Sequence, residues 1–271
     1  MNHQAPSFRP VLAKTYDSKK HKAAGWWASE KFDGVRCIYM DGSFFTRTGI
    51  KIKVPPFFSK HFPPAAHLDG ELYGGVRQFD RTSGVVRHHH ASASEWQNLT
   101  FQVFDLVSPQ WKNQPYKIRY SQLTTLLNGH LSKYLKRVEQ IPCASDTHLQ
   151  RLLKTVEERD GEGLVLRDPE AVYEHKRSGS LLKVKSYRSI DAEVVGHEIS
   201  KAGKYKGILG ALICRIDENG PQWKCGTGFT DAQRANPPAL GLRITVKFFE
   251  WTKNGKPRFP VFAGIRAEQN L

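Results

Sequence analysis

At 271 residues, with 39% hydrophobic and 25% charged content, the chain can bury a core and form one large globular domain or two modest ones. Lysine and arginine total 41 against 26 acidic residues, giving a formal net charge of +15 that suits a polyanionic partner, with plain solubility as the alternative. No apolar run is long enough to span a bilayer, and the first residues lack the basic-then-apolar pattern of a secretory leader. The cysteines, at positions 37, 143, 214 and 225, lack the spacing of a zinc site.

A lysine lies between two predicted strands near the start of the chain. Residues 24–28 are apolar and aromatic, and residues 35–40 alternate apolar and polar before Asp41-Gly42, a typical hairpin turn. Lys31, in the stretch Lys31-Phe32-Asp33-Gly34, is therefore expected at the mouth of a sheet. A lysine kept uncharged by burial and by neighbouring cations can attack an electrophile. Because this pattern is short, an ordinary solvated lysine is the alternative interpretation.

The following segment is predicted to hold three more strands with polar side chains near their ends. These strands are residues 44–49, 67–74 and 100–107. The first includes Arg47, the second carries two carboxylates of which one is Glu71, and the third carries Phe104 and an acid. Prolines at both ends of residues 55–64 bracket a segment expected to hold one short helix.

Two helices are predicted next. A leucine face marks residues 121–130 as helical. Asp146 is expected to be the N-cap of a second helix that runs to Arg159, and Gly161 is expected to stop it.

Two strands then close the first domain, and both carry charged residues. Residues 162–167 read as a buried strand opened by Glu162. In residues 181–185 the period of two aims Lys183 and Lys185 at the same face. A solvated sheet edge is the alternative explanation for this lysine pair.

From about Ser189 the character of the sequence changes to a series of short strands. Five are predicted, at residues 192–199, 210–216, 222–226, 243–251 and 260–266. Five strands in about eighty residues are typical of a Greek-key barrel of the oligonucleotide-binding (OB) type, and Thr230–Ala235 is predicted as a short helix. The predicted fold is thus α+β, with a domain of antiparallel sheets and flanking helices at 1–188 and an OB-fold barrel at 189–271.

The lysines and carboxylates form a coherent set for nucleotidyl transfer. Lys31 would attack the α-phosphate of a nucleoside triphosphate and expel pyrophosphate. Lys183 and Lys185 would offset the charge on the phosphoryl oxygens. Glu71 and Glu162 would hold Mg²⁺, with Mn²⁺ as the alternative.

Several of these assignments have a plain structural alternative. Phe104 would stack on the base, but core packing explains an aromatic residue in an apolar strand equally well. Glu71 and Glu162 would otherwise be surface acids at strand ends. Three consecutive histidines at 88–90 cannot all face one ion, so they are interpreted as a polar loop rather than a metal site.

The order of these motifs resembles the covalent nucleotidyltransferase superfamily of ATP-dependent DNA ligases, RNA ligases and mRNA capping enzymes. Residues 31–36, Lys-Phe-Asp-Gly-Val-Arg, are similar to that family's Lys-x-Asp-Gly-x-Arg motif, whose lysine becomes covalently adenylated. The resemblance implies that the backbone at Glu30 reads the adenine edge and that Phe104 stacks on the base. The nucleotide contacts it implies are made by Glu30, Lys31, Arg36, Arg47, Glu71, Phe104, Lys183 and Lys185.

The second half of the chain resembles the barrel of the smallest DNA ligases. The stretches at 223–229 and 258–266 are similar to barrel motifs of viral and bacterial enzymes, which implies that Arg266 orients the pyrophosphate in the first step. After Arg266 the acidic residue and lysine of larger ligases are replaced by Ala-Glu-Gln. Only residues 200–209 link the first two barrel strands, so no long loop is expected to encircle DNA, and Lys201, Lys204 and Lys206 would bind it instead.

This minimal form resembles the E-type bacterial ligases. The predicted function is ATP-dependent sealing of nicked duplex DNA by a monomer, through a lysyl-AMP adduct on Lys31 and a DNA-adenylate. The alternatives are an RNA ligase, a capping enzyme that uses GTP, and a non-catalytic basic nucleic-acid-binding protein. Many E-type ligases carry an export leader, so the resemblance suggests the periplasm, and the cytoplasm is the alternative compartment.

Two cysteines in the predicted barrel invite a structural question. If Asn219-Gly220 is a two-residue hairpin turn, Cys214 lies directly opposite Cys225, close enough for a disulfide. Two buried free thiols are the preferred interpretation, because Pro221 can shift the register.

Overall fold

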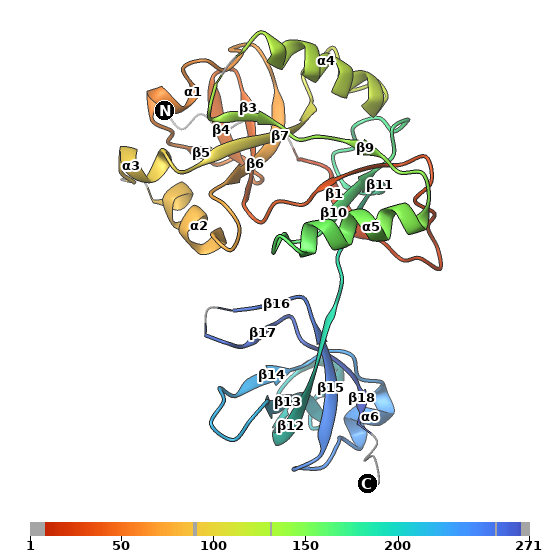
Figure 1. Cartoon of the computed structure of the whole chain (residues 1–271). Helices are drawn as coiled ribbons and strands as arrows, with labels where there is room; N and C mark the ends of the chain where they lie inside the picture. Colours follow the sequence, from red (N-terminus) through yellow and green to blue (C-terminus); the bar gives the residue numbers. More distant parts are fainter. Residues whose placement is uncertain (1–8, 89–90, 131, 253, 267–271) are drawn as a thin grey trace. The chain divides into compact units, whose positions relative to one another are not determined.

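The computed structural model describes residues 9–88, 91–130, 132–252 and 254–266 (Figure 1). The chain divides into two compact units, Met1–Lys185 and Ser186–Leu271, and the expected boundary at 188/189 lies three residues later. Both units mix strands with few helices, so the α+β class is confirmed. Two of the three histidines at 88–90 and the residues after Arg266 lie outside the described residues.

The first unit contains a six-stranded sheet in the order β5-β4-β3-β6-β7-β8. Its strands are β3 Val35–Met40, β4 Ser43–Thr46, β5 Lys51–Ile52, β6 Leu68–Tyr73, β7 Thr100–Leu106 and β8 Leu135–Arg137. The pair β7–β8 is parallel and the other pairs are antiparallel. The β3–β4 hairpin forms as predicted because Asp41 and Gly42 both adopt positive φ, as a tight hairpin turn requires.

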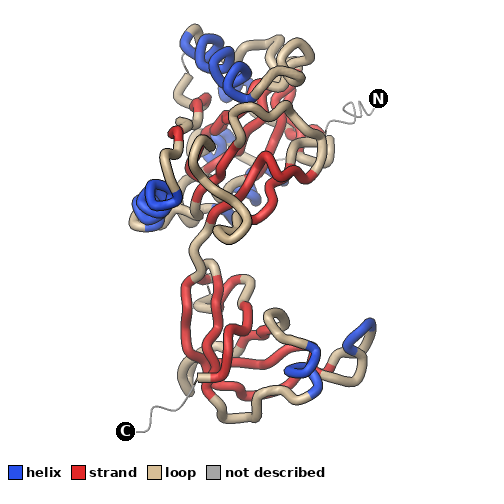
Figure 2. The backbone as a smooth tube through the Cα atoms, turned by 90° about the vertical axis from the view of Figure 1, so that its right-hand side faces the viewer, coloured by secondary structure: helices blue, strands red, loops and turns tan. Residues whose placement is uncertain are grey.

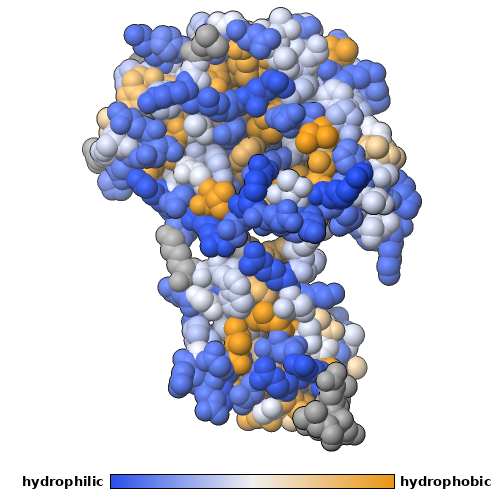
Figure 3. All heavy atoms as spheres, in the orientation of Figure 1, coloured by the Kyte–Doolittle hydropathy of each residue, from blue (hydrophilic) through white to orange (hydrophobic). Residues whose placement is uncertain are grey.

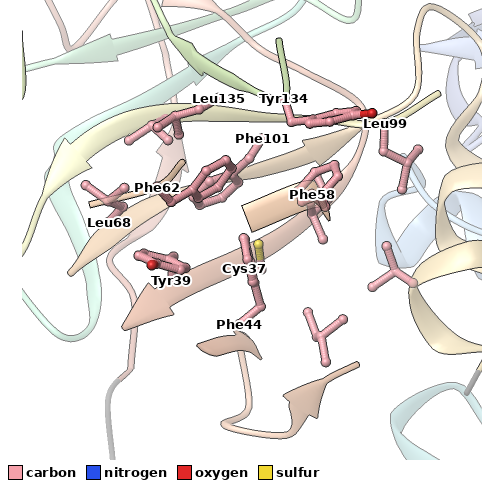
Figure 4. Packing of buried hydrophobic residues seen from close by; sticks show 14 of the residues in the cluster. Cys37, Tyr39, Phe44, Phe58, Phe62, Leu68, Leu99, Phe101, Tyr134 and Leu135 are labelled. Atoms are coloured by element: carbon pink, nitrogen blue, oxygen red, sulfur yellow. The ribbon is translucent and has the colours of Figure 1, made fainter. Parts of the chain in front are cut away.

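One face of this sheet packs an aromatic core against short helices. These are α1 Pro56–Ser59, α2 Phe79–Arg87, α3 Ala93–Trp96 and α4 Tyr116–Asn128. Phe44, Phe58, Phe62 and Phe101 pack edge to face or stack within this core (Figure 4). Because side chains alternate along a strand, the neighbours of these residues point to the opposite face of the sheet, where the charged residues lie.

The second sheet of this unit has the order β1-β11-β10-β2-β9. Its strands are β1 Leu12–Thr15, β2 Trp27–Glu30, β9 Ile141–Pro142, β10 Leu164–Arg167 and β11 Arg177–Val184. Helix α5, Asp146–Glu157, covers one face with Leu149, Leu153 and Val156. Strand β2 begins three residues later than the expected start at residue 24, because Gly25 turns the chain with a φ of 82°.

The ends of α5 correct two expectations. Ser145, not Asp146, is the N-cap, since its side chain accepts from His148 N while Asp146 takes the first helical position. The left-handed residue after the helix is Asp160, with φ of 59°, rather than Gly161. Gly161 is needed for another reason: a Cβ there would lie 2.4 Å from a methyl carbon of Val156.

The second unit is a five-stranded barrel with the order β14-β13-β12-β15-β18. Its strands are β12 Arg188–Ile199, β13 Leu209–Arg215, β14 Trp223–Cys225, β15 Arg243–Phe248 and β18 Val261–Ile265. A bridge between Thr227 and Val261 joins the two edges, so the barrel closes. Figure 2 shows that strands dominate this unit, which also contains the short helices η1 Gly203–Tyr205 and α6 Asp231–Ala235.

Two details of the barrel differ from expectation. The strand expected at 243–251 is interrupted after Phe248, and β16 Glu250–Trp251 pairs instead with β17 Pro257–Arg258 as a separate hairpin. Cys214 pairs with Trp223, and Cys225 with Leu212, so the expected direct opposition of the two cysteines is wrong. Strand pairing resumes only after the proline at 221, which has no N–H to donate. Both thiols are buried and free, which confirms the preferred interpretation.

Candidate active site

Lys31 lies directly after β2, where three strand ends meet. Its backbone N–H donates to the carbonyl of Gly163 at 2.9 Å. Gly163 has a φ of 137°, and a Cβ there would lie 2.4 Å from the carbonyl oxygen of Val184 at the end of β11. The glycine of the Lys-x-Asp-Gly stretch has a similar role, since a Cβ on Gly34 would lie 2.2 Å from the carbonyl oxygen of Leu72 in β6. Close backbone approach therefore places Lys31 between the two sheets.

The Lys31 amine is held by a carboxylate that is itself shared between two lysines. Lys31 Nζ donates to Glu162 Oε2 at 2.5 Å, and Lys185 Nζ donates to Glu162 Oε1. The side chains of Lys31, Lys185 and Glu162 retain 27%, 16% and 11% of their exposure. The expectation of an amine surrounded only by cations is therefore incomplete, because the closest partner of Lys31 is an acid.

Lys183 is the third lysine near Glu162. It lies on β11, and Lys185 follows directly after the end of that strand, while Leu182 and Val184 pack into the core. Burial, and then the charges of Lys185 and Lys31, lower the pKa of Lys183. The half-buried side chain of Lys183 and its lowered pKa argue against a plain solvated edge.

Glu71 faces this cluster from the six-stranded sheet. It lies on β6, opposite Arg36 on β3. Burial raises the pKa of Glu71 to about 7, while Arg36 and Lys31 lower it and Glu162 adds to the increase. Glu71 is therefore neither a surface acid nor an isolated one, and near neutral pH it exchanges between its charged and neutral forms.

Arg36 and Phe104 lie together on the face of the six-stranded sheet that carries Glu71. Arg36 donates Nε and Nη2 to the two oxygens of Asp69, both at 2.6 Å, and its guanidinium carbon lies 4.5 Å from the centre of the Phe104 ring. Val103 and Asp105 pair with the adjacent residues Gly70 and Asp69 of β6, so Phe104 is the extra residue of a β-bulge. Alternation from the core residues Phe101 and Val103 already places Phe104 on the opposite face, where its ring is half-buried, and the bulge brings Asp105 to that same face.

Three of the expected site residues are not brought into the lysine cluster by any contact among the described residues. The side chain of Glu30 pairs with Arg159 at 3.1 Å on the α5 side of the sheet, so only its backbone borders Lys31. Arg47 is exposed in the turn between β4 and β5. Arg266 belongs to the second unit, where it pairs with Asp191.

Sequence reasoning missed a buried charge network between the two sheets. Asp105 is fully buried and accepts from Arg119 at 2.8 and 2.9 Å and from Arg167 at 3.0 Å. Tyr173 OH donates to Asp69 at 2.5 Å. An acid within the apolar strand at 100–107 was the available signal, but its partners come from α4 and β10 and are not visible in local sequence.

The residues for a metal site are limited to a pair of carboxylates. Among the described residues, no group of three or more His, Cys, Asp or Glu side chains is arranged to hold an ion. Glu71 and Glu162 flank Lys31, and both oxygens of Glu162 already accept from lysines. Since Mg²⁺ is commonly bound by one or two carboxylates together with substrate phosphates, this donor set fits a cation that arrives with the nucleotide and not a preformed protein cage.

The second unit presents basic residues beside a short connection. Strand β12 ends at Ile199 and β13 begins at Leu209, so no long loop is present between them, as predicted. In this connection Lys201, Lys204 and Lys206 are exposed, and Lys204 pairs with Asp231 at 2.8 Å. Hydrophilic side chains cover much of the visible face of each unit (Figure 3). Within the described part of the chain, no helix combines the length and the apolar character needed to cross a membrane.

Comparisons with known proteins agree with this geometry. Residues 10–185 match the family model of the ATP dependent DNA ligase domain, and residues 202–266 match that of the DNA ligase OB-like domain. A DNA ligase of Haemophilus influenzae is 36% identical over 252 residues, which cover 93% of this chain and 90% of that protein.

Solved structures give the same result. The structure described as "DNA binding with a minimal scaffold: Structure-function analysis of Lig E DNA ligases" is 35% identical, with a TM-score of 0.83, and the match covers 95% of this chain and 99% of that chain. The Chlorella virus DNA ligase-adenylate, at 24% identity and a TM-score of 0.58 over 95% of this chain and 99% of that chain, shares the fold.

Proposed function

The chain belongs to the family of ATP-dependent DNA ligases, and from that premise we propose that it seals nicks in duplex DNA through an enzyme adenylate on Lys31. The contact that carries this proposal is the ion pair of Lys31 with Glu162, flanked by Lys185. An amine, a carboxylate and further cations in one cleft are what transfer of a nucleotidyl group to nitrogen requires. The RNA ligase, capping and non-catalytic alternatives are not favoured by the family matches.

In the first step, Lys31 Nζ would form a bond to the α-phosphorus of ATP while the bond from that phosphorus to pyrophosphate breaks. The ammonium must lose one proton before its nitrogen can attack, and Glu162 Oε2 at 2.5 Å is positioned to accept it. The second proton leaves the nitrogen as the P–N bond forms. Lys183 and Lys185 would offset the charge that accumulates on pyrophosphate.

The remaining residues of the cleft would bind the nucleotide. Phe104 presents a half-buried ring for the base, and the backbone at Glu30 borders the opposite strand end. Arg36 is held by Asp69, so it would act as a fixed donor beside the ring instead of a mobile side chain. Arg47 and Arg266, which stand outside the cluster, would contact the phosphates of the nucleotide or the nick.

We propose that Mg²⁺, or Mn²⁺, is held by Glu71 and Glu162 together with the phosphates of ATP. The cation would supply charge neutralisation at the reacting phosphate. Each oxygen of Glu162 has a second lone pair, so the cation would either share the carboxylate with the lysines or replace one of them. Ionised Glu71 is required for the same role, so its raised pKa makes the site sensitive to pH.

In the second and third steps, AMP would pass from Lys31 to the 5′-phosphate at the nick, and the 3′-hydroxyl would then displace AMP. The exposed lysines of the second unit would hold the DNA backbone, and the protein would act as a monomer. We further propose a periplasmic location, which rests on the resemblance to E-type ligases alone and is tested by fractionation of cells that express the full gene.

The direct test is incubation of the purified protein with ATP and Mg²⁺, followed by intact mass measurement and by sealing of a singly nicked DNA duplex. Wild type is expected to gain the mass of AMP and to seal the nick, and Lys31→Ala is expected to do neither. An adduct on the Lys31→Ala protein would contradict the assignment of the nucleophile. GTP in place of ATP and a nicked RNA duplex in place of DNA test the capping and RNA ligase alternatives.

A further inference from the structure

The base-binding ring of this cleft stands on a β-bulge whose backbone is held from outside the sheet. The bulge takes Phe104 out of the regular β6–β7 register, and its carbonyl accepts a hydrogen bond from Tyr116 OH at 2.8 Å. Tyr116 is the first residue of α4, and it is fully buried. This contact therefore fixes the backbone at the one position of β7 where strand pairing is irregular.

Tyr116 is itself held rigidly. Its backbone N–H donates to the carbonyl of Ala171 at 2.9 Å. The guanidinium carbon of Arg167, from the other sheet, lies 4.5 Å from the centre of the Tyr116 ring, and the ring of Trp27 lies 5.8 Å away edge to face. Burial raises the pKa of Tyr116 well above its ordinary value, so the hydroxyl keeps its proton and remains a donor.

We propose that Tyr116 is a positioning residue that sets the affinity of the cleft for the adenine base by fixing the bulge that carries Phe104. The inference rests on the proposed function, in which Phe104 stacks on the base. A ring that must stack is useful only if its plane is fixed before the ligand arrives, because ordering it on binding costs affinity. Because Tyr116 is fully buried and its hydroxyl donates to the carbonyl of Phe104, its effect would pass through the backbone of Phe104.

The chain offers a matched control one turn further along the same helix. Tyr120 OH donates to the carbonyl of Val138 at 3.0 Å and accepts from Arg137, and its ring centre lies 5.7 Å from that of Trp27. Tyr116→Phe and Tyr120→Phe therefore each remove one hydroxyl from α4 and leave one backbone carbonyl without that donor. Only the first removes a contact to the bulge.

The experiment measures the rate of enzyme–AMP formation against ATP concentration, after bound AMP has been discharged with pyrophosphate. Inorganic tripolyphosphate, which lacks the base, serves as a competing ligand, and the unfolding temperature is recorded for each variant. Since an aromatic contact of this kind is worth about 0.5–1.5 kcal/mol, Tyr116→Phe is expected to raise the half-saturating ATP concentration about 2- to 13-fold. The saturated rate and the inhibition constant of tripolyphosphate should not change, and Tyr120→Phe should leave all three values unchanged.

The same substitution made in the Phe104→Leu protein distinguishes failure of this proposal from failure of the function on which it rests. Phe104→Leu is expected to weaken ATP binding by itself, and adding Tyr116→Phe to it should have no further effect. Suppose that Phe104→Leu weakens ATP binding. The positioning role is then wrong, while the proposed function stands, if Tyr116→Phe lowers only the unfolding temperature. The same conclusion follows if Tyr116→Phe raises the half-saturating ATP concentration of the Phe104→Leu protein as much as that of wild type. If Phe104→Leu leaves the ATP dependence unchanged, the stacking role of Phe104 fails first and the positioning role with it.

Discussion

Replacing Arg119 with alanine should unfold the first unit at a markedly lower temperature. Arg119 is 2% exposed and makes two hydrogen bonds to Asp105 and two to the carbonyls of Gln114 and Ala171. Removing one partner of a buried ion pair costs about 3–5 kcal/mol, and the lower limit applies because Arg167 still pairs with Asp105. For a unit of this size, about 3 kcal/mol corresponds to a decrease of about 6–12 °C in the unfolding midpoint.

Differential scanning calorimetry is the suitable assay, because a two-unit chain is not expected to unfold in one two-state transition. The control is the exposed pair Lys154–Glu158 at the end of α5, whose atoms are 3.8 Å apart and whose side chains are 78% and 63% exposed. Lys154→Ala is therefore expected to lower the free energy of unfolding by about 0.5 kcal/mol or less. Arg119→Lys should lie between the two variants because it restores the charge without the paired donors. A decrease for Arg119→Ala no larger than for Lys154→Ala would refute the reasoning that this network holds the two sheets together.

The site itself allows three further predictions. Glu162→Gln, which removes the acceptor nearest to Lys31, should slow enzyme–AMP formation at least about 100-fold in single-turnover mass measurements, and a rate within threefold of wild type would exclude a proton-accepting role. Since burial raises the pKa of Glu71 to about 7, this residue favours folding fully below its ordinary pKa and loses that contribution as pH rises through 7. The unfolding midpoint of Glu71→Gln should therefore increase relative to wild type between pH 5 and 8, and a constant difference would contradict the raised pKa. Gly34→Ala should lower both the unfolding midpoint and the adenylation rate, because its Cβ would meet a backbone oxygen at 2.2 Å, and a fully active, equally stable variant would show that the approach is not that close.

Local sequence signals predicted most strands because their causes are local. Alternation along residues 35–40 and 181–185, together with the turn at Asp41-Gly42, needs no information from distant residues. The misses occurred where two local signals compete. Serine and aspartate both cap helices, and the prediction of Asp146 missed that the neighbouring Ser145 is the cap. The hairpin predicted at 219–220 turns one residue earlier, with Gly220 N bonded to the carbonyl of Asp217, and the barrel register shifts with it.

The sequence predicted which residues form the site but not which of them pair with one another. Lys31 and Glu162 are 131 residues apart, so no spacing rule brings them together. Glu162 was predicted as a metal ligand, and the fold adds the contacts that the sequence could not give, with its two oxygens accepting from Lys31 and Lys185. The partners of Asp105 could not be predicted either. A buried acid in an apolar strand needs cationic partners, but Arg119 and Arg167 come from elements that only folding brings close to it.

The carboxylate of Glu162 also suggests how nucleotide binding prepares the nucleophile. Its Oε2 accepts from Lys31 and its Oε1 from Lys185, so in the free protein one carboxylate neutralises two cations. A triphosphate brings several negative charges to the same lysines, and Lys185 can then exchange its bond to Glu162 for a bond to phosphate at little cost. Lys31 has no such need, because its task is to lose a proton. We infer that ATP itself separates the carboxylate from its second lysine. Glu162 is then left with one oxygen on the attacking amine and one free for a cation, and this is why Glu162→Gln should impair chemistry more than nucleotide binding.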